Sequence, residues 1–185
     1  MGRAIRCCGI RREELFITTK LWVTDVSYEG AKRGLERSLS LLGLDYIDLL
    51  LIHQPYHDYY GAWRAMEEFN AQGKVRCIGV DNFKQDRLAD FVFFNKVKPA
   101  VNFMECNAFF QREDERQYLQ SKDIQMQAWA PLAAGEQKLF ENDILLGIAE
   151  KHGKSVAQVV LRWLVQRGDC SCGKILKSGS HEGES

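Results

Sequence analysis

Residues 45–55 read Asp-Tyr-Ile-Asp-Leu-Leu-Leu-Ile-His-Gln-Pro, and this stretch decides the fold. Five of the six residues from Ile47 to Ile52 are apolar, so the run lacks the alternation of a strand that has one face in water. Such a run is typical of a strand in a parallel sheet that is covered on both faces. Similar β-rich runs lie at residues 15–19, 75–80, 100–104 and 124–129.

Helical patterns separate these runs. Apolar residues repeat at helical spacing in residues 31–42 and 156–164, and shorter patterns lie at residues 63–70 and 88–92. Gly43 and Gly73 follow helical patterns, and Gly153 follows Lys151-His152, each at a position where a helix C-cap is expected. The alternation of strands and helices predicts parallel strands that are joined by right-handed crossovers.

The spacing of the predicted strand ends is consistent with two fold classes. The ends fall near residues 20, 53, 81, 105 and 129, at intervals of 33, 28, 24 and 24 residues. Units of this length suit a (β/α)8 barrel, and they also suit a doubly wound sheet, although no G-x-G-x-x-G motif follows any of the runs. Five runs in 185 residues are too few for a standard barrel of eight strands.

The composition argues against several functional classes. The chain is 45% apolar and has 25 basic and 25 acidic side chains, which is typical of a globular protein without a nucleic-acid-binding charge excess. Its longest strongly apolar run, residues 49–52, is far too short to cross a membrane, and residues 1–14 lack the apolar core of an export signal. We therefore expect a cytoplasmic protein that binds neither nucleic acid nor a membrane.

The six cysteines predict free thiols. A disulfide-stabilised protein would be shorter and richer in cysteine. Cys170 and Cys172 form a C-x-C pair, but no His or Cys pair lies nearby at the spacing of zinc ligands. No metal site is predicted.

Polar residues stand at the predicted strand ends, where parallel barrels carry their chemistry. Lys20 follows the first run, His53 follows the second, and Asp81 and Asn82 follow the third. Lys20 and His53 would then converge on one pocket. Each residue also has a plainer interpretation, because such a lysine is often a solvated loop residue and such a histidine is often structural. Asn82 is equally suited to capping the next helix.

Several motifs, in order along the chain, resemble the aldo-keto reductase family. Residues 12–23 resemble its third-strand region, residues 45–55 its fourth strand, and residues 73–83, Gly-Lys-Val-Arg-Cys-Ile-Gly-Val-Asp-Asn-Phe, its fifth-strand signature. Residues 99–102 and 127–132 are similar to strands six and seven, and residues 148–163 to the helical stretch before strand eight. The resemblance covers residues 2–168 and is nearest to the bacterial 2,5-diketogluconate reductase branch.

This resemblance implies an α/β fold, the (β/α)8 TIM barrel of the aldo-keto reductase type. Strands three to seven would be present here, and strands one, two and eight would be missing or altered. The implied activity is that of an oxidoreductase, the NADPH-dependent reduction of small aldehydes and ketones to alcohols. In the family, hydride passes from the nicotinamide to the carbonyl carbon, and a tyrosine gives the carbonyl oxygen its proton.

The resemblance also implies roles at the reacting carbonyl. Lys20 would be the lysine whose cation lowers the pKa of that tyrosine. His53 would be the histidine that orients the carbonyl and donates to its developing negative charge. Trp22 and Gln54 would contact the substrate.

For NADPH, the resemblance implies a second set of residues. Asn82 would hold the nicotinamide carboxamide, and Trp129 would stack on the nicotinamide ring. Asp81 and Phe103 stand where the family has a serine and a glutamine, and both changes are expected to weaken nicotinamide binding. The pyrophosphate and the cofactor's phosphate would be contacted by Pro131, Leu132 and Lys174.

The catalytic tyrosine and its paired aspartate belong to a family segment that lies upstream of the resemblance. That segment is absent from this sequence, and Tyr28, Tyr56, Tyr59 and Tyr60 do not occupy the catalytic position. Impaired turnover is therefore expected of this chain. The alternative is a non-catalytic remnant that binds NADPH or a partner.

The end of the sequence departs from the family, which continues after Gly168 with an apolar strand and Pro-Lys-Ser. Residues 169–178 instead read Asp-Cys-Ser-Cys-Gly-Lys-Ile-Leu-Lys-Ser. Read one base later, the codons of residues 169–175 can spell Ile-Val-Val-Val-Ala-Lys-Ser, which indicates a frameshift product. We predict a partial barrel at residues 1–168, an aberrant and disordered tail at 169–185, and self-association through the open barrel edge.

Overall fold

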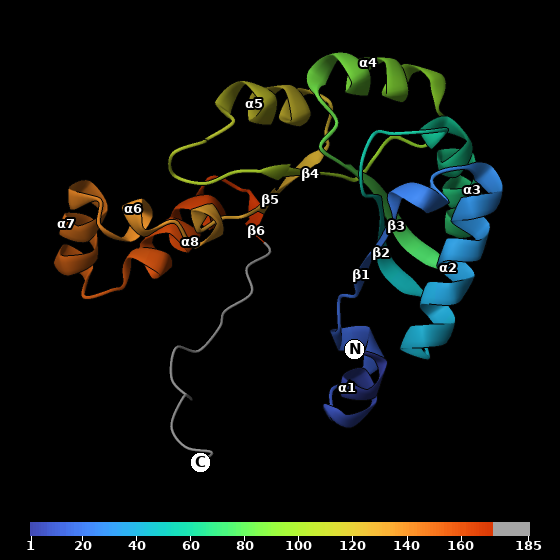
Figure 1. Ribbon diagram of the computed structural model, residues 1–185, viewed down its shortest axis with the longest axis horizontal. Helices are drawn as coiled ribbons and strands as arrows, with labels where there is room; N and C mark the ends of the chain where they lie inside the picture. Colours follow the sequence, from blue (N-terminus) through green and yellow to red (C-terminus); the bar gives the residue numbers. More distant parts are fainter. Residues whose placement is uncertain (172–185) are drawn as a thin grey trace. The chain divides into compact units, whose positions relative to one another are not determined.

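The computed structural model describes residues 1–171 (Figure 1). Its sheet has the strand order β1-β2-β3-β4-β5-β6, and the pairs β1–β2, β2–β3 and β3–β4 are parallel. The strands are β1 (Thr18–Leu21), β2 (Ile47–Ile52), β3 (Val75–Asp81), β4 (Val101–Glu105), β5 (Gln125–Trp129) and β6 (Cys170–Ser171). The predicted parallel sheet, with strands in sequence order, is therefore confirmed.

Helices lie between the strands, as the apolar spacing predicts. The α-helices are α1 (Gly2–Cys7), α2 (Tyr28–Leu42), α3 (Tyr59–Ala71), α4 (Gln85–Phe94), α5 (Glu113–Ser121), α6 (Gln137–Phe140), α7 (Asp143–His152) and α8 (Val156–Gln166). Three short 3-10 helices are η1 (Arg12–Glu14), η2 (Val23–Asp25) and η3 (Ala133–Gly135). Gly43 and Gly153 form left-handed C-caps of α2 and α7, with φ of 67° and 59°. The predicted caps at these two glycines are confirmed.

The structure shifts the first predicted strand along the chain. The apolar run at residues 15–19 predicts a strand that ends before Lys20, whereas β1 begins at Thr18 and includes Lys20. The Ile17 N–H donates to Asp48 Oδ2 at 2.8 Å, so a side chain satisfies this amide just ahead of the strand. Lys20 is consequently a strand residue rather than a loop residue.

Strand β6 lies within the segment that is predicted to be an aberrant tail. The Asp169 N–H donates to the Leu164 carbonyl at 3.1 Å, and β6 follows directly. Backbone pairing does not require the apolar pattern on which the prediction relies. The structure therefore corrects the prediction for Cys170 and Ser171, whereas residues 172–185, including Lys174, lie outside the described residues. The division at residue 168 stays a prediction.

The chain separates into two compact units. The first comprises residues 1–104 and 112–127, and the second comprises residues 105–111 together with the described residues from Ala128 onward. In the second unit, the core consists of Ala133, Leu139, Ala149, Val156 and Val160. A capping box between Ser155 and Gln158 begins helix α8 there.

The core of the first unit is built around β2, in which all six residues are buried. Helices α2 and α3 lie side by side along the sheet (Figure 1). Aromatic rings join α3 to α4, since Trp63 and Phe91 meet edge to face with 4.9 Å between ring centroids. Both rings are fully buried.

Asp48 is the charged residue of β2, and its side chain has no exposed surface. Its carboxylate accepts from Arg12 at 2.7 Å, from Arg76 at 3.0 Å and from the Ile17 N–H at 2.8 Å. Burial raises the pKa of Asp48, but the Ile17 N–H and the two guanidinium groups outweigh burial and hold the pKa below its ordinary value. The carboxylate thus ties the segment before β1 to strands β2 and β3.

Asp48→Asn is expected to lower the free energy of unfolding by roughly 3 kcal/mol at pH 7, because it leaves two guanidinium groups without their shared anion. The folded-state pKa lies below the unfolded one, so the stabilisation is present above the ordinary value of 3.8 and is lost as the pH falls through the folded-state pKa. Urea unfolding followed by tryptophan fluorescence measures both effects. Asp45→Asn, at an exposed carboxylate two residues before the strand, is the matched control. Equal urea midpoints for the two variants would contradict the prediction.

Candidate functional site

Three charged or titratable side chains of the first unit meet at the carboxyl ends of β1, β2 and β3. Asp81 Oδ2 lies 2.6 Å from Lys20 Nζ and 3.2 Å from His53 Nδ1. The strand register explains this meeting, because Leu21 pairs with Ile52 and Ile52 pairs with Val80. His53 follows Ile52 and Asp81 follows Val80, while Lys20 precedes Leu21. All three therefore flank the same set of paired residues. The predicted convergence of Lys20 and His53 is thus observed, with Asp81 joining them.

Asp81 is the buried member of this cluster. Its side chain is 1% exposed, against 29% for Lys20 and 25% for His53. Burial raises the pKa of the Asp81 carboxyl, and the Lys20 ammonium and the His53 ring oppose that rise. Asp81 Oδ1 is also buried and has no hydrogen-bond partner among the described residues. The cluster therefore has one buried acceptor that its own residues leave unused.

Aromatic rings flank the cluster. The Trp22 ring stacks on His53, with 5.0 Å between centroids and 23° between planes, while Trp22 itself is 56% exposed. Lys20 Nζ lies 4.0 Å from the centroid of the Phe103 ring, which is a cation–π distance. Phe103 is opposite Asp81 in the register of β3 and β4. The Lys20 ammonium is accordingly held between a carboxylate and an aromatic face.

Asn82 and Gln54 follow directly after the strand-end residues. Asn82 has a φ of 60°, in the left-handed region that asparagine tolerates better than most residues, and its N–H donates to the Phe103 carbonyl at 2.9 Å. Asn82 thus lies two residues before Lys84, the N-cap of α4, and is not the cap itself. The Gln54 carbonyl accepts from the Tyr56 N–H at 2.8 Å, so Gln54 begins a turn.

Three of the predicted cofactor residues lie in the second unit. Trp129 ends β5, and its carbonyl accepts from the Cys106 N–H at 3.1 Å. Pro131 is buried, and Leu132 packs against the core of this unit. The following backbone turns through left-handed conformations at Ala133 and Ala134.

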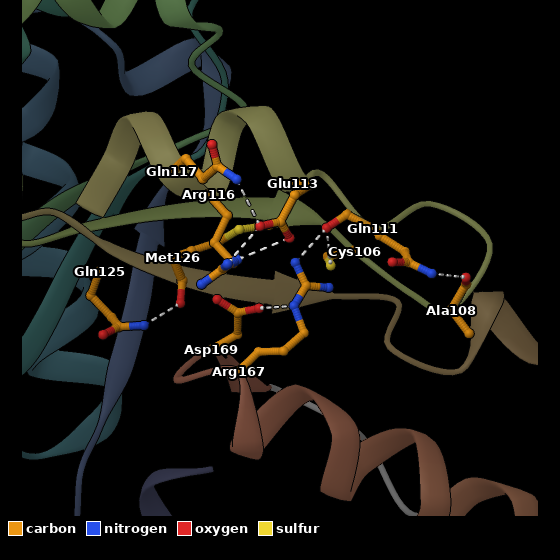
Figure 2. A network of polar contacts seen from close by, with 10 residues as sticks. All are labelled: Cys106, Ala108, Gln111, Glu113, Arg116, Gln117, Gln125, Met126, Arg167 and Asp169. Atoms are coloured by element: carbon orange, nitrogen blue, oxygen red, sulfur yellow. Dashed lines mark hydrogen bonds and ion pairs between the residues drawn. The ribbon is translucent and has the colours of Figure 1, made fainter. Parts of the chain in front are cut away.

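Arg167 organises a polar network in the second unit that the sequence interpretation did not include. Its Nη2 donates to the Gln111 carbonyl at 2.9 Å, and its Nε lies 3.5 Å from Asp169 Oδ2 (Figure 2). The guanidinium also lies 4.4 Å from the centroid of the Trp163 ring. Arg167 and Asp169 have opposite charges and lie two residues apart, and this spacing is the sequence signal that could have indicated their ion pair. The network anchors the chain between α8 and β6.

The described residues, 1–171, contain neither a metal-binding cluster nor a helix that could cross a membrane. Within them there is no group of three or more His, Cys, Asp or Glu side chains arranged to hold a metal ion. None of their helices has the length and apolarity needed to cross a membrane.

The model of the Aldo/keto reductase family matches residues 1–180. The chain belongs to this family. It is 44% identical over 178 residues to the glyoxal reductase of Bacillus subtilis, an alignment that covers 96% of this chain and 64% of that protein. It is 41% identical to the 9,11-endoperoxide prostaglandin H2 reductase of Trypanosoma cruzi, with coverage of 97% and 64%. The chain therefore spans 64% of the length of each of these aldo-keto reductases.

Solved aldo-keto reductase structures confirm the fold. An enzyme from a Medee basin deep-sea metagenome library matches with a TM-score of 0.92 at 39% identity, over 94% of this chain and 65% of that one. An aldo-keto reductase of the silkworm, Bombyx mori, solved with NADPH, matches with a TM-score of 0.84 at 33% identity, over 94% and 59%. The predicted (β/α)8 barrel of the aldo-keto reductase type, of which this chain has a part, is confirmed.

Lys20→Met is expected to lower the free energy of unfolding by roughly 3 kcal/mol, because it strips the ammonium from a buried carboxylate. Asp81→Ser is expected to be milder, since Lys20 is partly exposed and can turn to water. The double variant should be more stable than Lys20→Met alone, because no buried charge then remains. Urea unfolding of the four proteins provides the double-mutant cycle. The coupling would be contradicted if the change in unfolding free energy of the double variant equalled the sum of the two single changes within roughly 0.5 kcal/mol.

Proposed function

We propose that this chain forms part of an NADPH-dependent aldo-keto reductase that reduces small aldehydes and ketones to alcohols. The observation that carries the proposal is the cluster of Lys20, His53 and Asp81 at the carboxyl ends of three parallel strands. In barrels of this kind, those ends carry the reacting groups. Gln54 follows His53 in the chain, and the Trp22 ring stacks on the His53 ring. Both would contact a carbonyl substrate there.

The residues of the first unit fit the nicotinamide end of NADPH. A carboxamide presents an NH₂ donor and a carbonyl acceptor, and the buried Oδ1 of Asp81 is an acceptor without a partner among the described residues. The Asn82 amide would hold the other side of the carboxamide. When bound, NADPH would supply a hydride to the carbonyl carbon. In the second unit we assign Trp129 to the nicotinamide ring and Pro131 and Leu132 to the pyrophosphate.

His53 would stabilise the negative charge that develops on the carbonyl oxygen, and Lys20 would contribute positive charge nearby. The Asp81 carboxylate pairs with Lys20, so that charge is partly neutralised. The hydroxyl groups of Tyr28 and Tyr60 are hydrogen-bonded to residues outside this cluster. Tyr28 and Tyr60 donate to Glu68 and Asp90 respectively, and burial together with Asp90 raises the pKa of Tyr60.

We therefore expect this chain to bind NADPH but to turn over slowly on its own. With glyoxal as the probe substrate, NADPH oxidation should be at least about 100-fold slower than with Bacillus subtilis glyoxal reductase, because a positioned proton donor contributes about 10²–10⁴-fold. The absorbance of reduced nicotinamide measures the rate. A rate equal to that of the control enzyme would contradict the expected impairment. Binding without turnover would favour the alternative of a non-catalytic NADPH-binding remnant.

Asn82→Gly is expected to weaken NADPH binding about tenfold, the equivalent of one lost hydrogen bond of about 1.4 kcal/mol. Glycine adopts the left-handed backbone conformation of residue 82 without strain, so the substitution removes the side-chain amide without straining the backbone. Quenching of tryptophan fluorescence by NADPH measures the affinity. Asp123→Gly, at another left-handed position in the turn before β5, is the matched control. Unchanged affinity in Asn82→Gly would exclude the amide from the site, and no quenching of the unsubstituted chain would exclude NADPH binding.

The edge of the sheet supports the proposal that the chain self-associates. Strand β1 has β2 as its one neighbour in the order of the described strands, so one side of its backbone is left without a strand partner. We expect the sedimentation coefficient to rise with protein concentration. A coefficient of monomer size at every concentration would contradict this proposal.

A further inference from the structure

One oxygen of Asp81 serves two donors. Lys20 Nζ lies 2.6 Å from Oδ2, and His53 Nδ1 lies 3.2 Å from the same atom. A neutral imidazole has a single N–H, on either Nδ1 or Nε2, and the partner of one nitrogen decides which nitrogen carries it. The Asp81–His53 contact therefore fixes where the proton of His53 lies.

The short contact with Lys20 settles the direction of the second bond. An ammonium has three donors and no acceptor, and 2.6 Å is the length of a charge-assisted bond, so Oδ2 accepts from Lys20. A carboxylate that carries its charge on this atom has no proton to give. The contact with His53 then requires Nδ1–H to donate to Oδ2.

The imidazole is also held on its face. The Trp22 ring stacks on it with 5.0 Å between ring centroids, and the backbone N–H of His53 donates to the Leu21 carbonyl at 3.2 Å, which holds the main chain of this residue. Among the described residues, the charged group in contact with this imidazole is Asp81 from β3, and Lys20 from β1 shares its oxygen. The ring is thus oriented by Asp81 at the end of β3 and by Trp22, which follows β1.

We propose that Asp81 is a positioning residue that holds neutral His53 with its proton on Nδ1 and thereby makes Nε2 the atom at which this site gains and loses a proton. A serine hydroxyl, which the family has at this position, both donates and accepts, so it would leave the tautomer open. Asp81 removes that freedom, because a carboxylate only accepts.

The chemical consequence rests on the proposed carbonyl reduction. The imidazolium form of His53 donates Nε2–H to the carbonyl oxygen. This hydrogen bond would stabilise the negative charge that develops on the oxygen when bound NADPH supplies a hydride to the carbonyl carbon. The ring keeps its Nδ1–H on Asp81 throughout.

Long-range ¹H–¹⁵N correlation spectra of the ¹⁵N-labelled chain, without cofactor and at a pH where the ring is neutral, test the tautomer. His53→Gln assigns the resonances, and exposed His57 is an internal reference. We expect an unprotonated Nε2 and a protonated Nδ1 in His53. Asp81→Ser should shift the tautomer ratio at least about tenfold toward Nε2–H, as expected for loss of a hydrogen bond to a charged group.

Asp86→Asn, at an exposed carboxylate in the first turn of α4, should leave the His53 spectrum unchanged. A protonated Nε2 in neutral His53 of the unsubstituted chain overturns the proposal, whether or not Asp81→Ser folds. An unshifted ratio in folded Asp81→Ser overturns it as well. Because the spectra contain no cofactor, their outcome is separate from the NADPH titration, and either proposal can fail without the other.

Discussion

The complete burial of β2 is the constraint on which the first unit depends. A strand whose six side chains are all enclosed needs a strand on each edge and cover on each face. Strands β1 and β3 supply the edges in parallel register, and α2 and α3, which lie side by side, cover one face. Parallel pairing brings the carboxyl ends of all three strands to one side. The polar residues that follow the apolar run therefore meet there as a direct result of core formation.

This constraint explains why so much of the fold can be predicted from the sequence. The run at residues 47–52 predicts β2 with its observed bounds, and Gly43 and Gly153, interpreted as C-caps, predict the ends of α2 and α7. Elements with weak patterns could not be predicted. Helix α5 has a single buried residue, Leu119, and β6 has two residues, so neither has an apolar period to detect.

The candidate site was predictable in its members but not in its connections. Lys20 and His53 could be placed together because both stand at ends of neighbouring strands. Asp81 is predicted as a polar residue at a strand end and as a replacement on the cofactor side, but not as the partner of Lys20 and His53. Its contact with both residues depends on the register of β1, β2 and β3. A run of apolar residues without alternation does not determine which residues of two strands are paired. The opposite charges of Lys20 and Asp81, at the ends of two strands with β2 between them, are a sequence signal that could have indicated the pairing.

Asp81 changes what the cluster can do, because a buried carboxylate and an ammonium at 2.6 Å form a dipole rather than a free cation. The field of such a pair falls off faster with distance than that of a lone charge, so Lys20 acts on groups in direct contact more than on distant ones. The contacts described for this pair and for the His53 ring come from residues of the first unit that lie in strands β1, β3 and β4 or directly after β1. The proton chemistry of the cluster is therefore local to that unit.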